Sequence, residues 1–171
     1  PTPMLDQVEH IFEVCVEGVT GLQVLGDMIY GEADTFVQYH FPSQQNSTTA
    51  GVIKHGSSVS STLKPHRTAT TLCIPEPVFG CVSRHALRLP SSSPVQRELL
   101  SACSGAGGGG GGIPFELWCR YYYPNTRDQV VAKALLPLAK LCAMVTMQKR
   151  GEAGVQGFHL PLTAMAGAGG K

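Results

Sequence analysis

The sequence predicts an all-β protein, an antiparallel eight-stranded β-sandwich with one short helix and two flexible insertions. Short runs in which every second residue is apolar recur along the 171 residues, and this pattern is typical of half-buried strands. Glycine and proline separate the runs, and a single stretch changes to helical spacing. Many short strands with little helix favour two packed antiparallel sheets.

Alternation is clearest near the start of the chain, where Phe12 and Val14 fall on one face and Glu9 and Glu13 on the other. A second alternating run is expected to end at Pro42, because proline has no N–H group to donate to a neighbouring strand. The helix is expected at residues 138–148, where apolar residues recur at every third or fourth position. Strands are expected at residues 8–16, 35–41, 68–74, 82–89, 113–123, 130–136 and 155–162.

Two polar stretches predict flexible insertions within a single domain that spans residues 5–163. Residues 43–66 are rich in Ser and Thr, and residues 90–112 end in an unbroken run of six glycines. A glycine run cannot recover its backbone entropy by packing, although residues 96–103 could hold a helical turn. Residues 164–171 are expected to form a disordered tail.

Composition excludes several classes of function. The formal net charge is +1, so the chain lacks the basic stripe that nucleic acid requires, and we expect no nucleic-acid partner. Six cysteines without a CxxC pair indicate reduced thiols in the cytoplasm. No combination of nucleophile, base and orienting group stands out, so we expect no enzyme, and neither a cofactor nor a bound metal.

Several segments, in this order along the chain, resemble motifs of the C2 domain family. They are GEADTFV at 31–37, TATT at 68–71, PVFG at 77–80, FELW at 115–118 and DQVVAK at 128–133. The resemblance implies a C2-type β-sandwich. It extends over residues 8–41, 66–89 and 113–162.

A closer similarity, at residues 31–39 and 113–129, is to one C2 repeat of a centriolar scaffold protein. It implies a protein-binding module that acts in centriole elongation, distal appendage assembly and ciliogenesis. The partners it implies are other centriolar or ciliary proteins and neighbouring domains of the same chain. The implied localisation is the cytoplasm and cytoskeleton, at the centrosome, the centriole and the ciliary basal body.

The C2 resemblance also bears on calcium, which the calcium-binding members hold between apical loops. Calcium takes 6–8 oxygen ligands, supplied in such domains by about five carboxylates. The corresponding loops here offer only Asp27, Asp34 and Asp128, and Arg120 lies near the positions where further acids are expected. The sequence therefore predicts degenerate calcium loops with solvated acids.

The densest aromatic cluster predicts a partner-binding site formed by Trp118, Arg120, Tyr122 and Tyr123. Strand alternation directs the first three of these side chains away from the core. Exposed Trp, Tyr and Arg are favoured as interface anchors. The alternative is that Trp118 is covered by the first insertion or by the predicted helix, and the sequence leaves both open.

An alternative function is calcium-independent binding of phosphoinositides as a peripheral membrane module. Lys54, Lys64, His66 and Arg67 form a weak basic patch before the Thr-rich strand. Lipid-binding clusters usually hold 4–8 Lys or Arg residues. The sequence therefore favours a solvated insertion over a lipid site here.

Overall fold

The computed structural model describes residues 6–26, 30–44, 61–103, 111–152 and 154–166. In chain order its elements are β1 (Gln7–Gly18), the 3-10 helix η1 (Leu22–Leu25), β2 (Asp34–Gln44), β3 (Ser61–Arg67), β4 (Thr71–Leu72), β5 (Val78–Pro90), α1 (Val95–Cys103), β6 (Gly112–Tyr121), β7 (Arg127–Pro137), α2 (Leu138–Lys149) and β8 (Thr163–Ala164). Within the described residues, no helix is long and apolar enough to cross a membrane.

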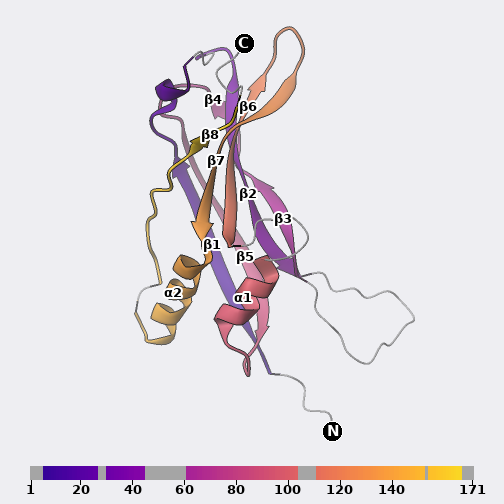
Figure 1. Ribbon diagram of the computed structural model, residues 1–171, viewed down its shortest axis with the longest axis vertical. Helices are drawn as coiled ribbons and strands as arrows, with labels where there is room; N and C mark the ends of the chain where they lie inside the picture. Colours follow the sequence, from indigo (N-terminus) through magenta and orange to yellow (C-terminus); the bar gives the residue numbers. More distant parts are fainter. Residues whose placement is uncertain (1–5, 27–29, 45–60, 104–110, 153, 167–171) are drawn as a thin grey trace, which may run out of the picture.

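The strands form two antiparallel sheets, which confirms the predicted sandwich. The smaller sheet pairs β1 with β5, and the larger has the order β3-β2-β6-β7-β8, with the short β4 also paired to β2. Figure 1 shows α1 and α2 together at one end of the molecule, and the β6–β7 turn and η1 at the other end. That second end is called the tip below.

The core lies between the two sheets and continues under the helices. Near the tip it is built around Leu22, Val37 and Leu117. Near the helices, Phe41 of β2 and Leu87 of β5 pack together with side chains from both helices. Fully burying one side chain of this size stabilises the fold by about 1.5–3 kcal/mol.

β3 corrects the expected flexible insertion at residues 43–66. β2 continues through Pro42 to Gln44, and β3 pairs with it along Gln38–Gln44. Pro42 is tolerated because the pairing of β2 with β6 ends at Tyr39, so β2 has only one neighbouring strand beyond that point. Residues 45–60 of the expected insertion lie outside the described residues.

α1 corrects the second expected insertion, at residues 90–112, and agrees with the helical turn considered for residues 96–103. Leu99, Ala102 and Cys103 are buried on one side of this helix, as the spacing of an amphipathic helix requires. Gly112, the last residue of that expected insertion, already belongs to β6. Only residues 104–110 of it lie outside the described residues.

The C-terminal segment also differs from expectation. Residues 155–162 form no strand, in keeping with Gly157 and Pro161, which disfavour regular pairing. The short β8 pairs with β7 instead, and Met165 donates its backbone N–H to the carbonyl of Val131 at 2.9 Å. The expectation of a disordered tail from residue 164 is therefore wrong for the first of these residues, which pair with β7. Residues 167–171 lie outside the described residues. The strand expected at 68–74 is reduced to β4.

Candidate functional site

The face of the larger sheet that is turned away from β1 and β5 is called the outer face. On it, β2 contributes Phe36, whose neighbour on β6 is Trp118. Strand pairing places Arg67 of β3 beside Gln38 on β2, and Asp128 of β7 beside Arg120 on β6. The outer face thus gathers side chains from four strands that are distant in sequence.

Phe36 and Trp118 stack on this face, with ring centroids 5.8 Å apart and an interplanar angle of 9°. The guanidinium carbon of Arg67 lies 4.9 Å from the Phe36 centroid and 5.6 Å from that of Trp118. The guanidinium carbon of Arg120 on β6 also lies close to Phe36, 5.4 Å from its ring centroid. Guanidinium groups at these distances are attracted to aromatic rings. Phe36 is consequently only 1% exposed although it points away from the core.

Trp118 is therefore half-buried, and neither open alternative from the sequence describes it fully. Among the described residues, Phe36 stacks on Trp118, and the side chain of Arg67 lies over the indole ring. Its indole N–H is buried and has no hydrogen-bond partner among the described residues. A buried donor without an acceptor costs free energy, so this stack is not held by polar contacts of Trp118 itself.

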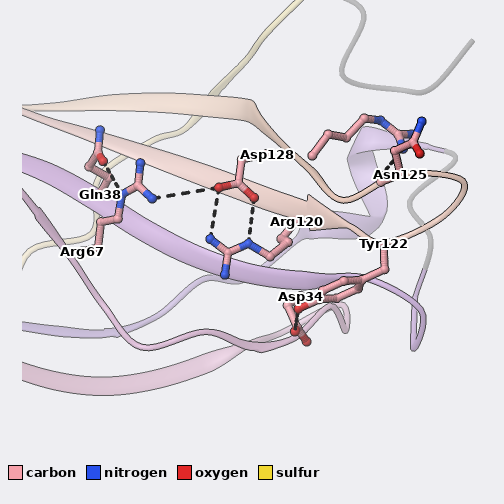
Figure 2. Close-up of polar contacts among 8 residues, drawn as sticks. Asp34, Gln38, Arg67, Arg120, Tyr122, Asn125 and Asp128 are labelled. Carbon is pink, nitrogen blue, oxygen red and sulfur yellow. Dashed lines mark hydrogen bonds and ion pairs between the residues drawn. The ribbon is translucent and has the colours of Figure 1, made fainter.

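A chain of polar contacts crosses the outer face (Figure 2). Arg120 donates from Nε and Nη2 to the two carboxylate oxygens of Asp128, at 2.8 and 3.1 Å. Arg67 lies 3.9 Å from the same carboxylate and donates from Nε to Gln38 Oε1 at 2.7 Å. Gln38 in turn donates to Glu116 Oε1 at 3.0 Å. Hydrogen bonding from Arg120 lowers the pKa of Asp128, and the same bond raises the pKa of Arg120.

At the tip, the hydroxyl of Tyr122 donates to the carboxylate of Asp34 (Figure 2). This bond raises the pKa of Tyr122. Arg127 secures the β6–β7 turn by donating to the carbonyls of Tyr123 and Asn125, at 3.1 and 3.3 Å. A surface hollow in this region is lined by Arg120, Tyr122, Thr126, Arg127 and Asp128.

The four residues predicted to bind a partner thus occupy two adjoining places. Trp118 and Arg120 lie on the outer face, where both are engaged by neighbours. Tyr122 and Tyr123 lie in the β6–β7 turn and are 47% and 88% exposed. Sequence reasoning missed Phe36, because nothing in an alternating strand shows that a side chain turned away from the core will be covered.

The acids expected to belong to degenerate calcium loops have a definite geometry. Asp34, Arg120 and Asp128 face one another in register across β2, β6 and β7, with the arginine in the middle. Asp27 lies outside the described residues. Among the residues described, no three His, Cys, Asp or Glu side chains are placed to hold a metal ion. Two acids separated by a guanidinium do not fit calcium, which requires 6–8 oxygens.

The basic residues expected to bind lipid do not form the single patch that the sequence suggested. Within β3 the side chains alternate, so Lys64 and His66 point toward the smaller sheet while Arg67 lies on the outer face. His66 packs beside His85, with ring centroids 4.2 Å apart. Lys54 lies outside the described residues. The alternation was not foreseen because this segment was expected to be flexible.

The two antiparallel sheets and their order define the class of this protein: it is an antiparallel β-sandwich domain. The particular protein that it resembles is C2 domain-containing protein 3. The chain is 55% identical to that protein of Xenopus tropicalis over 162 residues, and 54% identical to that of Mus musculus over 158 residues. These alignments cover 94% and 92% of the chain but only 7% of each relative. The chain therefore corresponds to a small segment of those proteins, and the similarity expected from the sequence is confirmed.

No family model matches the chain. One solved structure, described as "CC2D1B coordinates ESRCT-III activity during the mitotic reformation of the nuclear envelope", is similar with 16% identity and a TM-score of 0.45. That similarity covers 82% of this chain and 46% of the other.

Proposed function

We propose that this chain is a non-catalytic, calcium-independent C2 module of a centriolar and ciliary scaffold protein. It binds other centriolar or ciliary proteins and neighbouring domains of the same chain, at the centrosome, the centriole and the ciliary basal body. Its role is in centriole elongation, distal appendage assembly and ciliogenesis. The support is the sequence resemblance to a centriolar scaffold, together with the similarity to C2 domain-containing protein 3.

The observation that carries a protein-binding role is the layer of arginine over aromatic side chains on the outer face. Trp118 lies at its centre, covered by Arg67, whose side chain is 49% exposed. Exposed Tyr122 and Tyr123 extend this surface to the tip. Trp, Tyr and Arg are the residues that most often dominate the binding energy of protein interfaces. Arg67 contacts Asp128 only at 3.9 Å, so a partner carboxylate could bind it at little cost.

The proposed independence from calcium follows from Arg120. Its guanidinium lies between the two described apical acids and engages both oxygens of Asp128. A divalent cation would have to displace this guanidinium and would be repelled by its charge. Recognition by this module therefore depends on shape, aromatic surface and arginine, without a bridging ion.

The proposal is tested by co-precipitation of the 171-residue chain with known centriolar proteins from ciliated cells. Tyr122→Ala and Arg120→Glu are expected to reduce recovery of the partner at least tenfold, as loss of an interface anchor does. Lys64→Ala on the opposite face is the matched control and should bind normally. Thermal unfolding of each variant shows that the fold is retained. Equal recovery by wild type and both variants would contradict this site.

A second arm of the experiment uses vesicles that contain phosphoinositides, sedimented at physiological salt. We expect no calcium-independent co-sedimentation, because Lys64 and Arg67 lie on opposite faces of β3. Strong binding that is lost in both Lys64→Ala and Arg67→Ala would favour a membrane module over a scaffold module.

A further inference from the structure

Among the described residues the smaller sheet has two strands, β1 and β5, which pair in regular register from Gln7 to Val16, with a register shift before Gly18. Within the described part of the chain, β5 is the only strand that pairs with β1. One edge of β1, a strand of 12 residues, therefore has no neighbouring strand. An uncovered edge presents a row of N–H and C=O groups that can pair with another polypeptide.

Two contacts show which residues of β1 direct their backbone groups toward this edge. The N–H of Ser91 donates to the carbonyl of Asp6 at 2.8 Å, just beyond the paired region. On β5, the N–H of Arg88 donates at 2.8 Å to the side chain of Gln44, so it faces away from β1. Hydrogen-bonded and non-hydrogen-bonded residue pairs alternate along an antiparallel ladder. Both contacts therefore lead to the same assignment: Asp6 and Ser91 form a hydrogen-bonded pair, and Glu9 and Arg88 do not.

It follows that the even-numbered residues of β1 bond to β5, as in the pair of His10 with Leu87. The odd-numbered residues Glu9, Ile11, Glu13 and Cys15 direct their N–H and C=O groups to the free edge. Among the described residues, none of these groups has a backbone hydrogen bond outside the ladder. Their side chains are all exposed, and Ile11 is 65% exposed.

The two edges of this sheet are not equivalent. On the β5 edge, the side-chain amide of Gln44 accepts from the N–H of Arg88 and also donates to the carbonyl of Arg88 at 2.5 Å. Both backbone groups of Arg88 on that edge are therefore already bonded. No described side chain makes such a contact with the β1 edge. The β1 edge is therefore the one that is available to another strand.

The charges on this edge select the strand that it accepts. Glu9 and Glu13 are exposed on either side of Ile11, and Glu13 also forms an ion pair with Arg84 of β5 at 3.1 Å. Glu17, also exposed, lies at the register shift between Val16 and Gly18. In a second copy of β1, antiparallel pairing centred on Ile11 would set Glu9 of each copy against Glu13 of the other, and only a shifted register would avoid this. Like charges directly opposite one another destabilise a sheet, whereas opposite charges stabilise it.

We propose that the free edge of β1 is a docking site for an extended basic segment of a separate polypeptide. The segment adds antiparallel to β1 as a third strand. It carries Lys or Arg opposite Glu9 and Glu13 and β-branched residues opposite Ile11 and Cys15. This site lies on a different sheet from the arginine-covered aromatic surface, and each can be tested without the other.

Hydrogen exchange of the free 171-residue chain tests the open edge first. The backbone amides of Glu9, Ile11 and Glu13 should exchange quickly, and those of His10 and Phe12 slowly. Slow exchange of the first three at low chain concentration would overturn the proposal, because the edge would already be paired. Protection that grows with chain concentration would also overturn it, because the occupant would then be a second copy.

The probe for the partner is the synthetic peptide KTVTKTVTK. Its binding should protect the amides of Glu9, Ile11 and Glu13, and the peptide ETVTETVTE should bind at least tenfold more weakly. N-methylation of the third, fifth and seventh peptide residues should abolish binding, because their amides face β1. N-methylation of the fourth and sixth residues, whose amides face away, should be tolerated.

Variants of the chain complete the test. Ile11→Pro removes an edge N–H that β5 does not use and should weaken the peptide at least tenfold, while Ile11→Ala should retain most binding. The double substitution Glu9→Lys and Glu13→Lys should reverse the preference to ETVTETVTE. Thermal unfolding confirms that each variant folds. Binding of KTVTKTVTK that is unchanged by both Ile11→Pro and the charge reversal would overturn the proposal.

Discussion

Arg120 on β6 and Asp128 on β7 form a two-point contact, in which Nε and Nη2 of the arginine each bond to a separate carboxylate oxygen. Because Arg120 is also the strand neighbour of Asp34, a single cation lies between two acids that otherwise would face each other. At the tip, the positive charge of Arg120 therefore lies between the negative charges of Asp34 and Asp128.

Calcium titration tests whether this group of one arginine and two acids binds the ion. We expect isothermal titration of the wild-type chain to show no saturable binding up to about 1 mM calcium, since the described residues of the site supply too few oxygen ligands for the ion. Arg120→Asp removes the cation and sets three acids in a row, so it should gain weak affinity, roughly millimolar. Micromolar affinity of the wild-type chain that disappears in Asp128→Asn would show that the tip does hold calcium.

A second prediction concerns His85, which is buried between the sheets. Its Nε2 lies 2.5 Å from the Tyr39 hydroxyl, and its ring stacks on Phe41 at 4.6 Å. Burial, and then the neighbouring His66, lower the pKa of His85 from 6.5 to about 4. Between these two values the unfolded chain binds the proton and the folded chain does not. The free energy of unfolding should therefore fall by at most about 3 kcal/mol as pH drops from 6.5 to 4.

Chemical denaturation at a series of pH values measures this effect. His85→Gln should make the free energy of unfolding much less dependent on pH in this window, while His159→Gln, at an exposed position, should leave the dependence intact. The lowered pKa of His66 acts in the same direction, so some slope should remain in His85→Gln. A pH dependence that is identical in wild type and His85→Gln would refute the assignment.

A third prediction concerns Gly112, the first residue of β6. A Cβ atom added there would lie 2.0 Å from the carbonyl oxygen of Leu136 on β7, whereas one added at Gly111 would meet nothing within 4 Å. Gly112→Ala should therefore force the two strands apart and lower the free energy of unfolding by about 1–3 kcal/mol. Gly111→Ala is the matched control and should change it little. Equal thermal midpoints for the two variants would contradict the close approach of β6 and β7.

Much of the sheet architecture could be predicted from local sequence. The alternation that places Phe12 and Val14 toward the core, and glutamates toward solvent, holds in β1. The helix expected from apolar spacing at residues 138–148 is confirmed as α2. Period two and period 3.6 are properties of neighbouring residues, so they are legible without knowledge of the fold.

The misjudged segments share a different cause. β3 contains Pro65 and polar residues and shows no strong strand pattern, yet it pairs with β2 because the edge of β2 offers a complete row of partners. α1 follows a serine-rich turn and becomes helical where Leu99 and Cys103 can be buried. In both segments the stabilising contacts come from residues distant in the chain, and tertiary contacts override weak local propensity.

The sequence alone determined the class of fold, the face on which each principal strand buries its side chains, and the shortage of acids in the loops that were compared with calcium loops. Tertiary structure decided that Arg67 covers Trp118, that Arg120 separates Asp34 from Asp128, and that one edge of β1 has no neighbouring strand among the described residues. The physical reason is that composition and periodicity belong to short stretches of chain. Contacts between side chains, and the edges that stay unpaired, depend on which strands become neighbours in space.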